Sequence, residues 1–443
     1  SKFYLHFLKY FVGWFNRDLD KYITPEYKAE IYGVSASASD KYNYIGSNYQ
    51  RILNYHAAHD IGHALQNLAL VGCTSFGTWG GKSADSNMII GRNFDFYVGD
   101  HFSENKIVAF EHPSEGHNFM SVTWGGFIGV VSGMNDKGLT ATINADTSSI
   151  PTGSATPVSV LAREILQYAE NIAEAEAIAR KRKMFVSESF LVGSAEDGKA
   201  VIIEKTPDSM SVYDPNRNYI ICANHFQSKG LENLKSNQLQ IKESASEYRY
   251  QRLQQLLDAT KQNTVQRTVD ILRDRRGMND EDIGLGNEKA IDQLIAHHSI
   301  VFEPKKGLVW VSTAPWQLGK FVCYDLNKVF SMAGMKTDRE IRDSSLDVPA
   351  DSFLLTPAYR GFLRFHQYKE EIMDGHPVNP DSVIISNPNF YQSYELAGNE
   401  LFKRKDYRRA IEYYRQALNK VIATKGEENY IRNQIKKAEE KIK

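Results

Sequence analysis

The chain has 443 residues, of which 42% are hydrophobic, 12% aromatic and 24% charged. These fractions are typical of a globular protein with a full core, and they exclude a mostly disordered chain. The 53 Lys and Arg residues balance 54 Asp and Glu residues. Because nucleic-acid binding needs a concentrated basic surface, we expect no nucleic-acid partner.

The three cysteines (Cys73, Cys222 and Cys323) are too few for a scaffold held together by disulfides. The sequence begins at Ser1 rather than at Met. We therefore expect that an upstream segment has been removed, either by a signal peptidase or by design of the expressed protein. This favours an exported protein (periplasmic, secreted or membrane-associated), although the cysteine count leaves the cytoplasm open.

The first 72 residues are predicted to be a mostly helical leader. Aromatic and apolar residues recur at helical spacing from Tyr4 to Phe15, and residues 49–70 form a second apolar-periodic stretch. The aromatic first helix has two interpretations. It packs on the rest of the protein, which we favour, or it makes contact with a membrane surface.

Residues 73–330 are predicted to form an α+β domain in which two packed sheets are flanked by helices. Short alternating runs separated by glycine and Asn-Asp turns indicate antiparallel strands. The expected strands are 88–90, 106–110, 119–124, 128–132, 139–143, 189–192, 200–204, 210–213, 219–222, 299–302, 308–312 and 321–324. The expected helices are 157–168, 173–183 and 247–275.

The C-terminal quarter of the chain differs from the rest. Five of the 13 prolines lie between Pro349 and Pro388, so residues 331–390 are predicted to be a wrapping or linking segment. Residues 391–443 follow a tetratricopeptide pattern, with small residues such as Ala397 and Gly398 where two helices would cross closely. Only one copy is present, and a solenoid needs about three. We therefore favour a helical hairpin packed on the main domain over a peptide-binding array.

Two local motifs suggest chemistry that their details do not support. The stretch from Phe76 to Ser83 nearly matches a phosphate-binding loop, but Phe76 stands where that motif needs glycine. A glycine-rich hairpin turn is the better interpretation. His59 and His63 are one helical turn apart, as zinc ligands can be, but Asp60 stands where a metalloprotease needs glutamate. We expect hydrogen-bonded structural histidines, and no metal or other cofactor.

A third group of residues is spread over the predicted sheets. Gly72-Cys73-Thr74 stands where the helical leader gives way to a strand, and Gly91-Arg92-Asn93-Phe94-Asp95-Phe96 follows. Glycine-containing stretches at 126–130 and 133–139 and then Asn144 come next. Together these residues resemble the N-terminal-nucleophile hydrolases of the choloylglycine hydrolase and acid ceramidase group, in particular the autoproteolytic acyl-coenzyme A:6-aminopenicillanic acid acyltransferase branch. The resemblance runs from about Cys73 to Leu326.

The resemblance implies a four-layer αββα fold and a precursor that cleaves itself between Gly72 and Cys73. The Cys73 thiolate would attack the Gly72 carbonyl and form a thioester that water cleaves. Glycine before the nucleophile permits the backbone conformation that this attack needs. Cleavage would free the α-amino group of Cys73, whose usual pKa of about 7.7–8.0 suits a general base. The nucleophile would then need no histidine partner.

The resemblance also implies a role for each remaining residue. Arg92 would lie beside the sulfur and favour the thiolate, and Asp95 would hold the new α-ammonium group. Asn144 and Asn224 would donate to the oxyanion of the tetrahedral intermediate. Arg249 matches the family's distal arginine, from which Arg252 is one turn away. Taken singly, these residues would be ordinary surface ion pairs, turn residues or solvated helix positions.

The predicted substrate is a small-molecule N-acyl amine or N-acyl amino acid, cleaved at a linear amide. Aromatic residues near the predicted site (Phe76, Trp79, Phe94, Phe96, Trp124 and Phe127) would suit an apolar acyl group or simply fill the core. Alternatives are acyl transfer to an amine, a peptidase or β-lactam acylase with the same machinery, and a catalytically inactive tetratricopeptide-type scaffold. A homo-oligomer is compatible with the sequence.

Overall fold

The structure is a computed structural model and describes residues 10, 12–14, 16–65, 72–96, 99, 101–147, 153–332 and 340–442, with side chains at all of these except 58, 59 and 61–65. The predicted first helix, from Tyr4 to Phe15, falls mostly outside these ranges. None of the helices within them has the length and hydropathy to cross a membrane.

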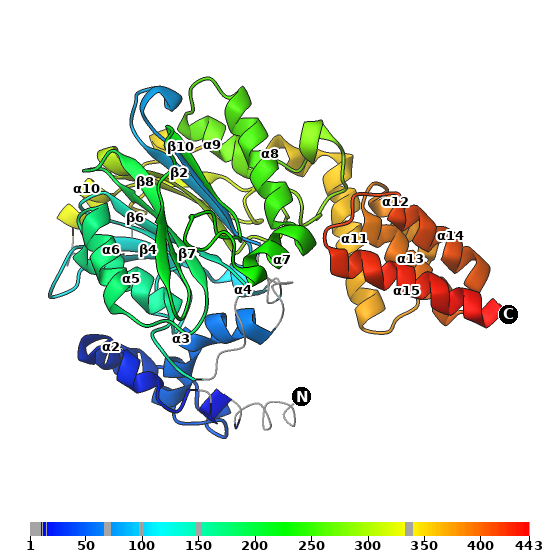
Figure 1. The fold of residues 1–443 in the computed structure, drawn as a ribbon, viewed down its shortest axis with the longest axis horizontal. Coiled ribbons are helices and arrows are strands. Elements are labelled where there is room, and N and C mark those ends of the chain that lie inside the picture. Colours follow the sequence, from blue (N-terminus) through cyan, green and yellow to red (C-terminus); the bar gives the residue numbers. More distant parts are fainter. Residues whose placement is uncertain are drawn as a thin grey trace.

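Two antiparallel sheets form the centre of the molecule (Figure 1). The first has the order β10 (Tyr219–Cys222), β1 (Thr74–Thr78), β2 (Ile89–Phe94), β11 (His298–Glu303), β12 (Leu308–Ser312), β13 (Phe321–Asp325). The second has the order β3 (Ile107–Glu111), β4 (Phe119–Thr123), β5 (Ser132–Asn135), β6 (Leu139–Ala145), β7 (Glu188–Ser194), β8 (Lys199–Lys205), β9 (Met210–Tyr213). The two predicted sheets are thus confirmed.

Helices cover the outer face of each sheet. The second sheet is covered by α5 (Val158–Tyr168) and α6 (Ile172–Lys181), and the first by α8 (Ser246–Ala259) and α9 (Val265–Leu272). The remaining helices of the sandwich are α4 (His101–Glu104), α7 (Lys235–Glu243) and α10 (Leu326–Ser331). Short 3-10 turns are η1 (Leu19–Tyr22), η2 (Asp40–Tyr42), η3 (Gly80–Lys82), η4 (Met278–Asp280), η5 (Pro304–Lys306), η6 (Ser344–Leu346) and η7 (Ser352–Leu355). This is the predicted αββα arrangement.

Three separate buried clusters hold these layers together. One lies between the sheets and contains Ile90, Met134 and Val309. A second packs the first sheet against α8 and α9, and the third packs the second sheet against α5 and α6 and also includes Cys73 and Phe94 at one end of the first sheet. Because side chains alternate along a strand, neighbouring residues of β2 serve different layers: Ile89 belongs to the outer cluster and Ile90 to the cluster between the sheets.

The leader packs on the outside of the second sheet's helices. It contains α2 (Pro25–Ser35) and α3 (Asn48–Leu65), and α3 contacts both α2 and α5. Leader residues Tyr27, Ile31 and Ile52 belong to the same buried cluster as α5. The leader is therefore part of the folded body in the uncleaved chain.

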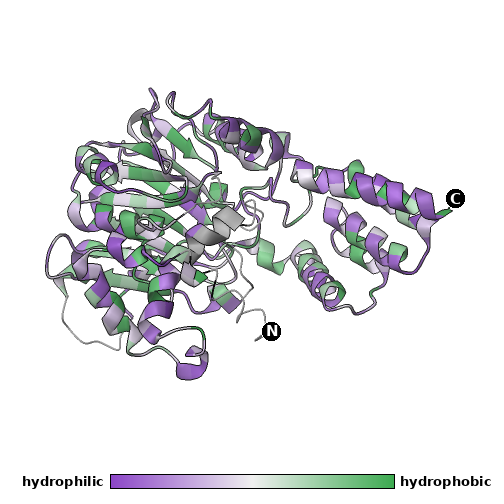
Figure 2. Ribbon diagram, turned by 60° about the horizontal axis from the view of Figure 1, so that its bottom comes forward, coloured by the Kyte–Doolittle hydropathy of each residue, from purple (hydrophilic) through white to green (hydrophobic). Residues whose placement is uncertain are grey.

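Five C-terminal helices form an appendage at one side of the sandwich (Figure 1). They are α11 (Pro357–Met373), α12 (Pro380–Ser386), α13 (Tyr391–Lys403), α14 (Tyr407–Leu418) and α15 (Lys425–Ile442). One buried cluster runs through all five, from Phe365 to Ile431. Strands of the sandwich are mainly hydrophobic, whereas α15, which ends at the C-terminus, is largely hydrophilic (Figure 2).

One predicted strand is wrong. Residues 128–131 are not in a strand, and β5 begins only at Ser132. The backbone there is bonded to helices instead: the Ile128 amide donates to His56 Nε2 at 3.0 Å, and the Val130 amide donates to Ser159 O at 2.9 Å. Apolar alternation alone could not reveal that these amides pair with α3 and α5.

Candidate active site

Cys73 lies immediately before β1, buried in the uncleaved chain with 1% of its surface exposed. Its neighbours on the strand point to opposite sides. Ser75 Oγ donates to Asn144 Oδ1 of the second sheet at 3.1 Å, whereas Phe76 lies in the outer cluster under α8 and α9. Odd positions of β1 therefore face the space between the sheets, which is where the thiol lies.

Arg92 enters the same space from β2. Its Nη2 lies 3.5 Å from Cys73 Sγ, and its Nη1 donates to Val131 O at 2.6 Å. Further hydrogen bonds go to Ser132 Oγ and Ile143 O. The second sheet thus fixes the guanidinium, whose Cζ atom lies 4.6 Å from the centre of the Phe94 ring. Its predicted place beside the sulfur is observed.

The carbonyl oxygen of Gly72 is held by two donors. Gln293 Nε2 lies 2.8 Å from it, and Arg249 Nη1 lies 3.2 Å from it. Arg249 also donates from Nη1 to Cys73 O at 2.7 Å and from Nη2 to Asn224 Oδ1 at 2.7 Å. The peptide group predicted to be cleaved is therefore anchored at its own carbonyl oxygen and at the next one along the chain.

Arg252 does not share this site. It forms ion pairs with Asp274 at 2.8 Å and Asp280 at 2.7 Å. Arg249 and Arg252 both lie on α8, but only Arg249 reaches Gly72 and Cys73. The choice of Arg249 over its neighbour agrees with this geometry.

Asp95 follows β2 and is completely buried beside Gln293. Its Oδ2 accepts from Gln293 Nε2 at 3.3 Å, and its backbone oxygen accepts from the Gly72 amide at 2.9 Å. Its Oδ1 has no hydrogen-bond partner within the described residues. Burial raises the pKa of this carboxyl well above its usual range, against the lowering effect of Arg249. A buried oxygen without a partner is the acceptor that a new α-ammonium group would need.

The two predicted oxyanion donors differ in how they are engaged. Asn144 Nδ2 donates to Cys222 O at 3.1 Å and Ala223 O at 3.0 Å, so both amide hydrogens link the two sheets. Asn224 Nδ2 donates only to Ala145 O at 2.8 Å within the described residues. One Asn224 hydrogen is therefore left for a ligand, which makes Asn224 the better oxyanion donor in this conformation.

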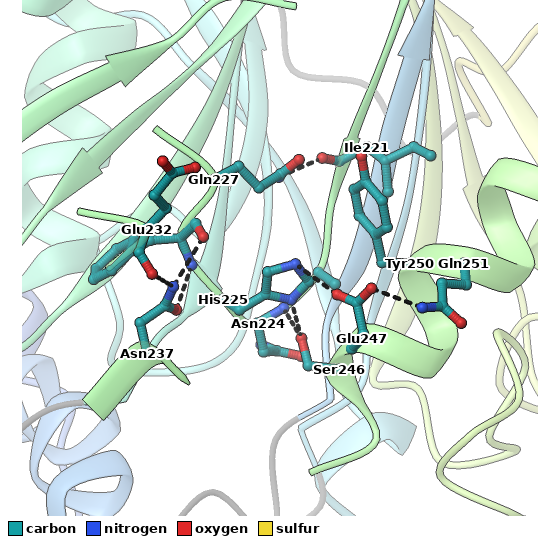
Figure 3. Close-up of polar contacts among 12 residues, drawn as sticks. Ile221, Asn224, His225, Gln227, Glu232, Asn237, Ser246, Glu247, Tyr250 and Gln251 are labelled. Carbon is teal, nitrogen blue, oxygen red and sulfur yellow. Dashed lines mark hydrogen bonds and ion pairs between the residues drawn. The ribbon is translucent and has the colours of Figure 1, made fainter. Parts of the chain in front are cut away.

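A polar network fixes the Asn224 backbone at the start of α8 (Figure 3). The Asn224 amide donates to Ser246 Oγ at 2.8 Å, and Ser246 Oγ also lies 2.7 Å from His225 Nδ1. Glu247 Oε2 lies 3.4 Å from His225 Nε2. Since α8 also carries Arg249, one helix terminus positions two residues of the site.

The thiol of Cys73 is strongly affected by its surroundings. Its pKa is raised to about 11, mainly by burial, against the lowering effect of Arg92 and with a smaller raising effect of Asp95. Arg92 thus favours the thiolate, but burial outweighs its effect while the Gly72–Cys73 bond is intact. Neutral thiol is therefore the main form of Cys73 near neutral pH.

Aromatic rings surround this end of the sandwich. Phe94 stacks 6.4 Å from Trp124, which lies 4.3 Å from Phe127, and these rings belong to or pack against the cluster that contains Cys73. Phe76 and Trp79, however, lie in the other two clusters. Phe94, Trp124 and Phe127 therefore lie near Cys73, whereas Phe76 and Trp79 do not share its cluster.

The structure describes the glycine motif and His56, a histidine on the same helix as His59 and His63. His56 Nδ1 lies 2.9 Å from Ile52 O, and His56 Nε2 accepts from the Ile128 amide. The side chains of His59 and His63 lie outside the described residues. Within the described ranges no group of three or more His, Cys, Asp or Glu side chains could hold a metal. Phe76–Ser83 forms the end of β1 and the turn η3 that leads toward β2.

Gln293 is the residue of this site that sequence reasoning missed. It lies in the long connection between η4 and β11, where no strand or helix period marks it. Nothing in the local pattern Asp292-Gln293-Leu294 distinguishes it from a loop residue. Only its contact with Gly72, 221 positions away, shows where it acts.

The two antiparallel sheets stacked between helical layers form a four-layer αββα sandwich, the architecture of N-terminal-nucleophile hydrolases. The chain belongs to the acyl-coenzyme A:6-aminopenicillanic acid acyl-transferase family, whose model matches residues 80–314, just over half of the chain. The match includes Arg92, Asp95, Asn144, Asn224 and Arg249, and begins after Gly72 and Cys73. Family and fold together support a function of the amidohydrolase or acyltransferase kind.

The chain is also similar to an uncharacterized protein of Archaeoglobus fulgidus, with 27% identity over 210 residues. That stretch covers 44% of this chain and 34% of the relative, so the chain spans about a third of that curated relative's length.

Among solved structures, this chain is similar to an N-acylethanolamine-hydrolyzing acid amidase ortholog of Caenorhabditis elegans, with 18% identity and a TM-score of 0.37. The similarity covers 53% of this chain and 93% of that protein. A conjugated bile acid hydrolase variant from Clostridium perfringens shows 12% identity and a TM-score of 0.39 over 58% and 93%.

Proposed function

We propose that this chain is a cysteine amidohydrolase that activates itself by cleaving Gly72–Cys73. It would then hydrolyse the linear amide of an N-acyl amine or N-acyl amino acid. The observation that carries the proposal is the setting of one peptide group. The Gly72 carbonyl is bonded to Arg249 and Gln293 immediately before a buried cysteine, whose sulfur lies 3.5 Å from Arg92.

Self-cleavage would proceed by an acyl shift. The Cys73 sulfur forms a bond to the Gly72 carbonyl carbon, the Gly72–Cys73 C–N bond breaks, and the thiol proton passes to the departing nitrogen. Water then hydrolyses the thioester, which returns the thiol and leaves a carboxylate on Gly72. The net change is the hydrolysis of one peptide bond, so no cofactor is required.

The freed α-amine would supply the base for the second reaction. With a usual pKa of about 7.7–8.0, it can take the proton of Cys73 as the sulfur attacks the substrate carbonyl. Asp95 Oδ1, buried and without a partner among the described residues, would accept a hydrogen bond from the resulting ammonium group. Asn224 would donate to the substrate oxyanion with its remaining amide hydrogen.

The aromatic cluster supports an apolar acyl group. Phe94, Trp124 and Phe127 pack in succession beside the space that holds Cys73. Apolar side chains with a few polar groups are typical of small-ligand sites. The family also supports a small-molecule substrate.

Acyl transfer is the second candidate, because the family is described as an acyl-transferase. The same thioester acyl-enzyme would be attacked by an acceptor amine in place of water. The two candidates share Cys73, Arg92 and Asn224 and differ only in the final nucleophile.

The test is hydrolysis of a panel of N-acyl amines and N-acyl amino acids with acyl chains of increasing length. We expect the wild-type protein to release the free amine and Cys73→Ala to release none. Cys323→Ala is the matched control, because Cys323 is a buried cysteine on the outer side of the first sheet, and it should retain activity. Equal turnover by Cys73→Ala would overturn the proposal, and the absence of turnover by the wild type would favour an inactive scaffold. Added amine acceptors would reveal transfer as a new N-acyl product.

A further inference from the structure

The side chain of Gln293 is hydrogen-bonded to the peptide group that we propose to be cleaved. Gln293 is buried, with 2% of its surface exposed, and its Nε2 makes its shorter contact, 2.8 Å, with Gly72 O. Its longer contact, 3.3 Å, is with Asp95 Oδ2. A Cβ atom at position 72 would lie 2.5 Å from Gln293 Nε2 and 2.9 Å from its Oε1. Glycine is therefore the residue that leaves room for this amide.

The hydrogen bond from Gln293 is made to Gly72 O, an oxygen that would gain negative charge during the proposed cleavage. When sulfur attacks the Gly72 carbonyl carbon, the carbonyl oxygen becomes an oxyanion. Donors already in place around such an oxygen, in a site without water, stabilise the transition state more than the ground state. Gly72 O has two such donors, the neutral amide of Gln293 and the charged guanidinium of Arg249.

We propose that Gln293 is a catalytic residue of the self-cleavage, which forms with Arg249 the oxyanion hole for Gly72. This inference rests on the proposed self-cleavage and adds a residue to it. The step forms the S–C bond, breaks the C–N bond and moves the thiol proton to the Cys73 nitrogen, and Gln293 stabilises the intervening tetrahedral oxygen without itself changing covalently.

The loop around Gln293 is shaped to hold this side chain. The next residue, Leu294, has φ +56°, a left-handed conformation that non-glycine residues rarely adopt. Leu294 is fully buried and packs in a small cluster with Leu318 and Phe362, the latter from α11 of the appendage. Strain of this kind persists only where surrounding contacts over-determine it.

Earlier in the same loop, the appendage makes direct hydrogen bonds. Asn387 accepts from the Leu285 amide at 3.1 Å and donates to Leu285 O at 2.8 Å. Asn287 Nδ2 donates to Val421 O at 2.8 Å. The appendage therefore supports the loop that presents Gln293 to Gly72.

The experiment follows cleavage of freshly made protein. The full chain is synthesised in a cell-free translation with a short labelling pulse, and the fraction cleaved is measured with time on denaturing gels. Gln293→Met keeps the length of the side chain and removes the donor, and we expect cleavage to slow by about 100-fold or more. Gln317→Met is the matched control. Gln317 is an equally buried glutamine whose side chain makes no hydrogen bond within the described residues, so its rate should stay near that of the wild type.

A double variant separates catalysis from folding. Gly72→Ala should slow cleavage because its methyl group displaces the Gln293 amide. Adding Gln293→Met to Gly72→Ala should then cost far less than it costs alone, because the donor has already been displaced. Effects that simply multiply would indicate a structural role and overturn the inference.

The possible results distinguish a wrong role for Gln293 from a wrong proposal of self-cleavage. If the wild type is not cleaved, or if Cys73→Ala is cleaved, the self-cleavage proposal itself is wrong. If the wild type is cleaved and Gln293→Met is cleaved at the rate of Gln317→Met, only the role of Gln293 is wrong. Should Gln293→Met fail to fold, Gln293→Asn gives the same test, since its amide is one methylene too short to reach Gly72 O.

Discussion

Two buried arginines hold Cys73 from opposite ends. Arg92 reaches the sulfur from β2, and Arg249 reaches the backbone carbonyl from α8. Because burial raises the thiol pKa to about 11 in the uncleaved chain, a cation at the sulfur alone does not produce a thiolate at neutral pH. We infer that the α-amine, present only after cleavage, completes the activation of the nucleophile.

Replacing Asn224 by Ala should lower kcat/KM for amide hydrolysis by about 100- to 1,000-fold, which corresponds to about 2.7–4 kcal/mol for one oxyanion donor. The loss should appear in kcat more than in KM, because the hydrogen bond strengthens in the transition state. Steady-state kinetics of the cleaved protein provides the measurement. Asn233→Ala, an exposed asparagine on the following loop, should behave as the wild type. An unchanged kcat for Asn224→Ala would remove Asn224 from the oxyanion hole.

At the scale of elements, strand β2 explains how a sequence motif becomes a site. Alternation directs Arg92 toward the second sheet and Asn93 toward the helices, where Asn93 Nδ2 donates to Leu272 O at 2.8 Å. Gly91 lies under α9, since a Cβ there would be 2.5 Å from Thr268 Cγ2. In the motif Gly91-Arg92-Asn93, the glycine therefore allows α9 to pack closely, the arginine reaches the site, and the asparagine bonds to the helical layer.

Sequence patterns were sufficient for the elements with a regular period. Most strands of both sheets and the helices α5 and α6 lie close to their predicted positions, whereas β5 overlaps its predicted range only at Ser132, and two helices, α8 and α9, replace the one predicted over 247–275. The proline-rich stretch was harder, because Pro357 and Pro380 lie in the first turn of α11 and α12. A proline there loses no hydrogen bond, so it begins a helix rather than ending one. The sequence does not predict the place of Gln293 in the site, because the path of a loop depends on tertiary contacts.

In the appendage, α13 and α14 cross closely at Gly398. A Cβ at this position would lie 2.6 Å from Tyr414 Cε1. We expect Gly398→Leu to destabilise the appendage by about 1–3 kcal/mol through overpacking. Hydrogen exchange should then show faster exchange in α13 and α14 with little change in the sheets. Gly426→Leu, at a position with only the Thr424 hydroxyl within 4 Å, serves as the control, and equal exchange in the two variants would contradict the proposed packing.

At the scale of the whole molecule, the leader and the sandwich share a buried group of carboxyls. Asp60 of α3 and Asp146 after β6 both raise the pKa of Glu188 on β7, in addition to the larger effect of burial, and Arg92 lowers it. Neither carboxyl oxygen of Glu188 has a hydrogen-bond partner within the described residues. The pKa values of Asp60 and Asp146 are also raised well above their usual range, mainly by burial.

These shifts predict a stability that falls with rising pH. A carboxyl with a raised pKa in the folded chain contributes fully below its unfolded pKa of about 4, and this contribution is lost as the pH rises toward the folded value. Buried histidines act in the opposite direction: the pKa values of His56 and His225 are lowered to about 4 by burial. Their contribution is complete above about pH 6.5 and is lost as the pH falls toward 4. Above about pH 7 the histidine contribution is complete, whereas the carboxyl effect continues and is opposed by Lys106, whose pKa burial lowers to about 8.

We therefore expect the unfolding free energy of the uncleaved Cys73→Ala protein to decrease from about pH 7 to about pH 8.5, by about 1.4 kcal/mol per pH unit for each carboxyl that stays protonated. Glu188→Gln in this background should make the slope shallower, because Glu188 is one of the carboxyls whose pKa burial raises. Chemical denaturation across this range gives the slopes, with the exposed Glu243→Gln as control. Parallel slopes for the two variants would show that Glu188 is ionised in the fold.

Export, contact of the leader with a membrane surface and assembly into a homo-oligomer stay predictions of the sequence. So do the tetratricopeptide assignment of residues 391–443 and the division of the chain at Gly72.

The central claim is the cleavage between Gly72 and Cys73, and the most direct test is intact mass under denaturing conditions for the wild type and Cys73→Ala. The account predicts two wild-type fragments, one ending at Gly72 and one beginning at Cys73, whose masses sum to the whole chain plus one water. Cys73→Ala should remain a single 50.3 kDa chain. A wild-type chain that stays whole after prolonged incubation, or an alanine variant cut at the same bond, would contradict it.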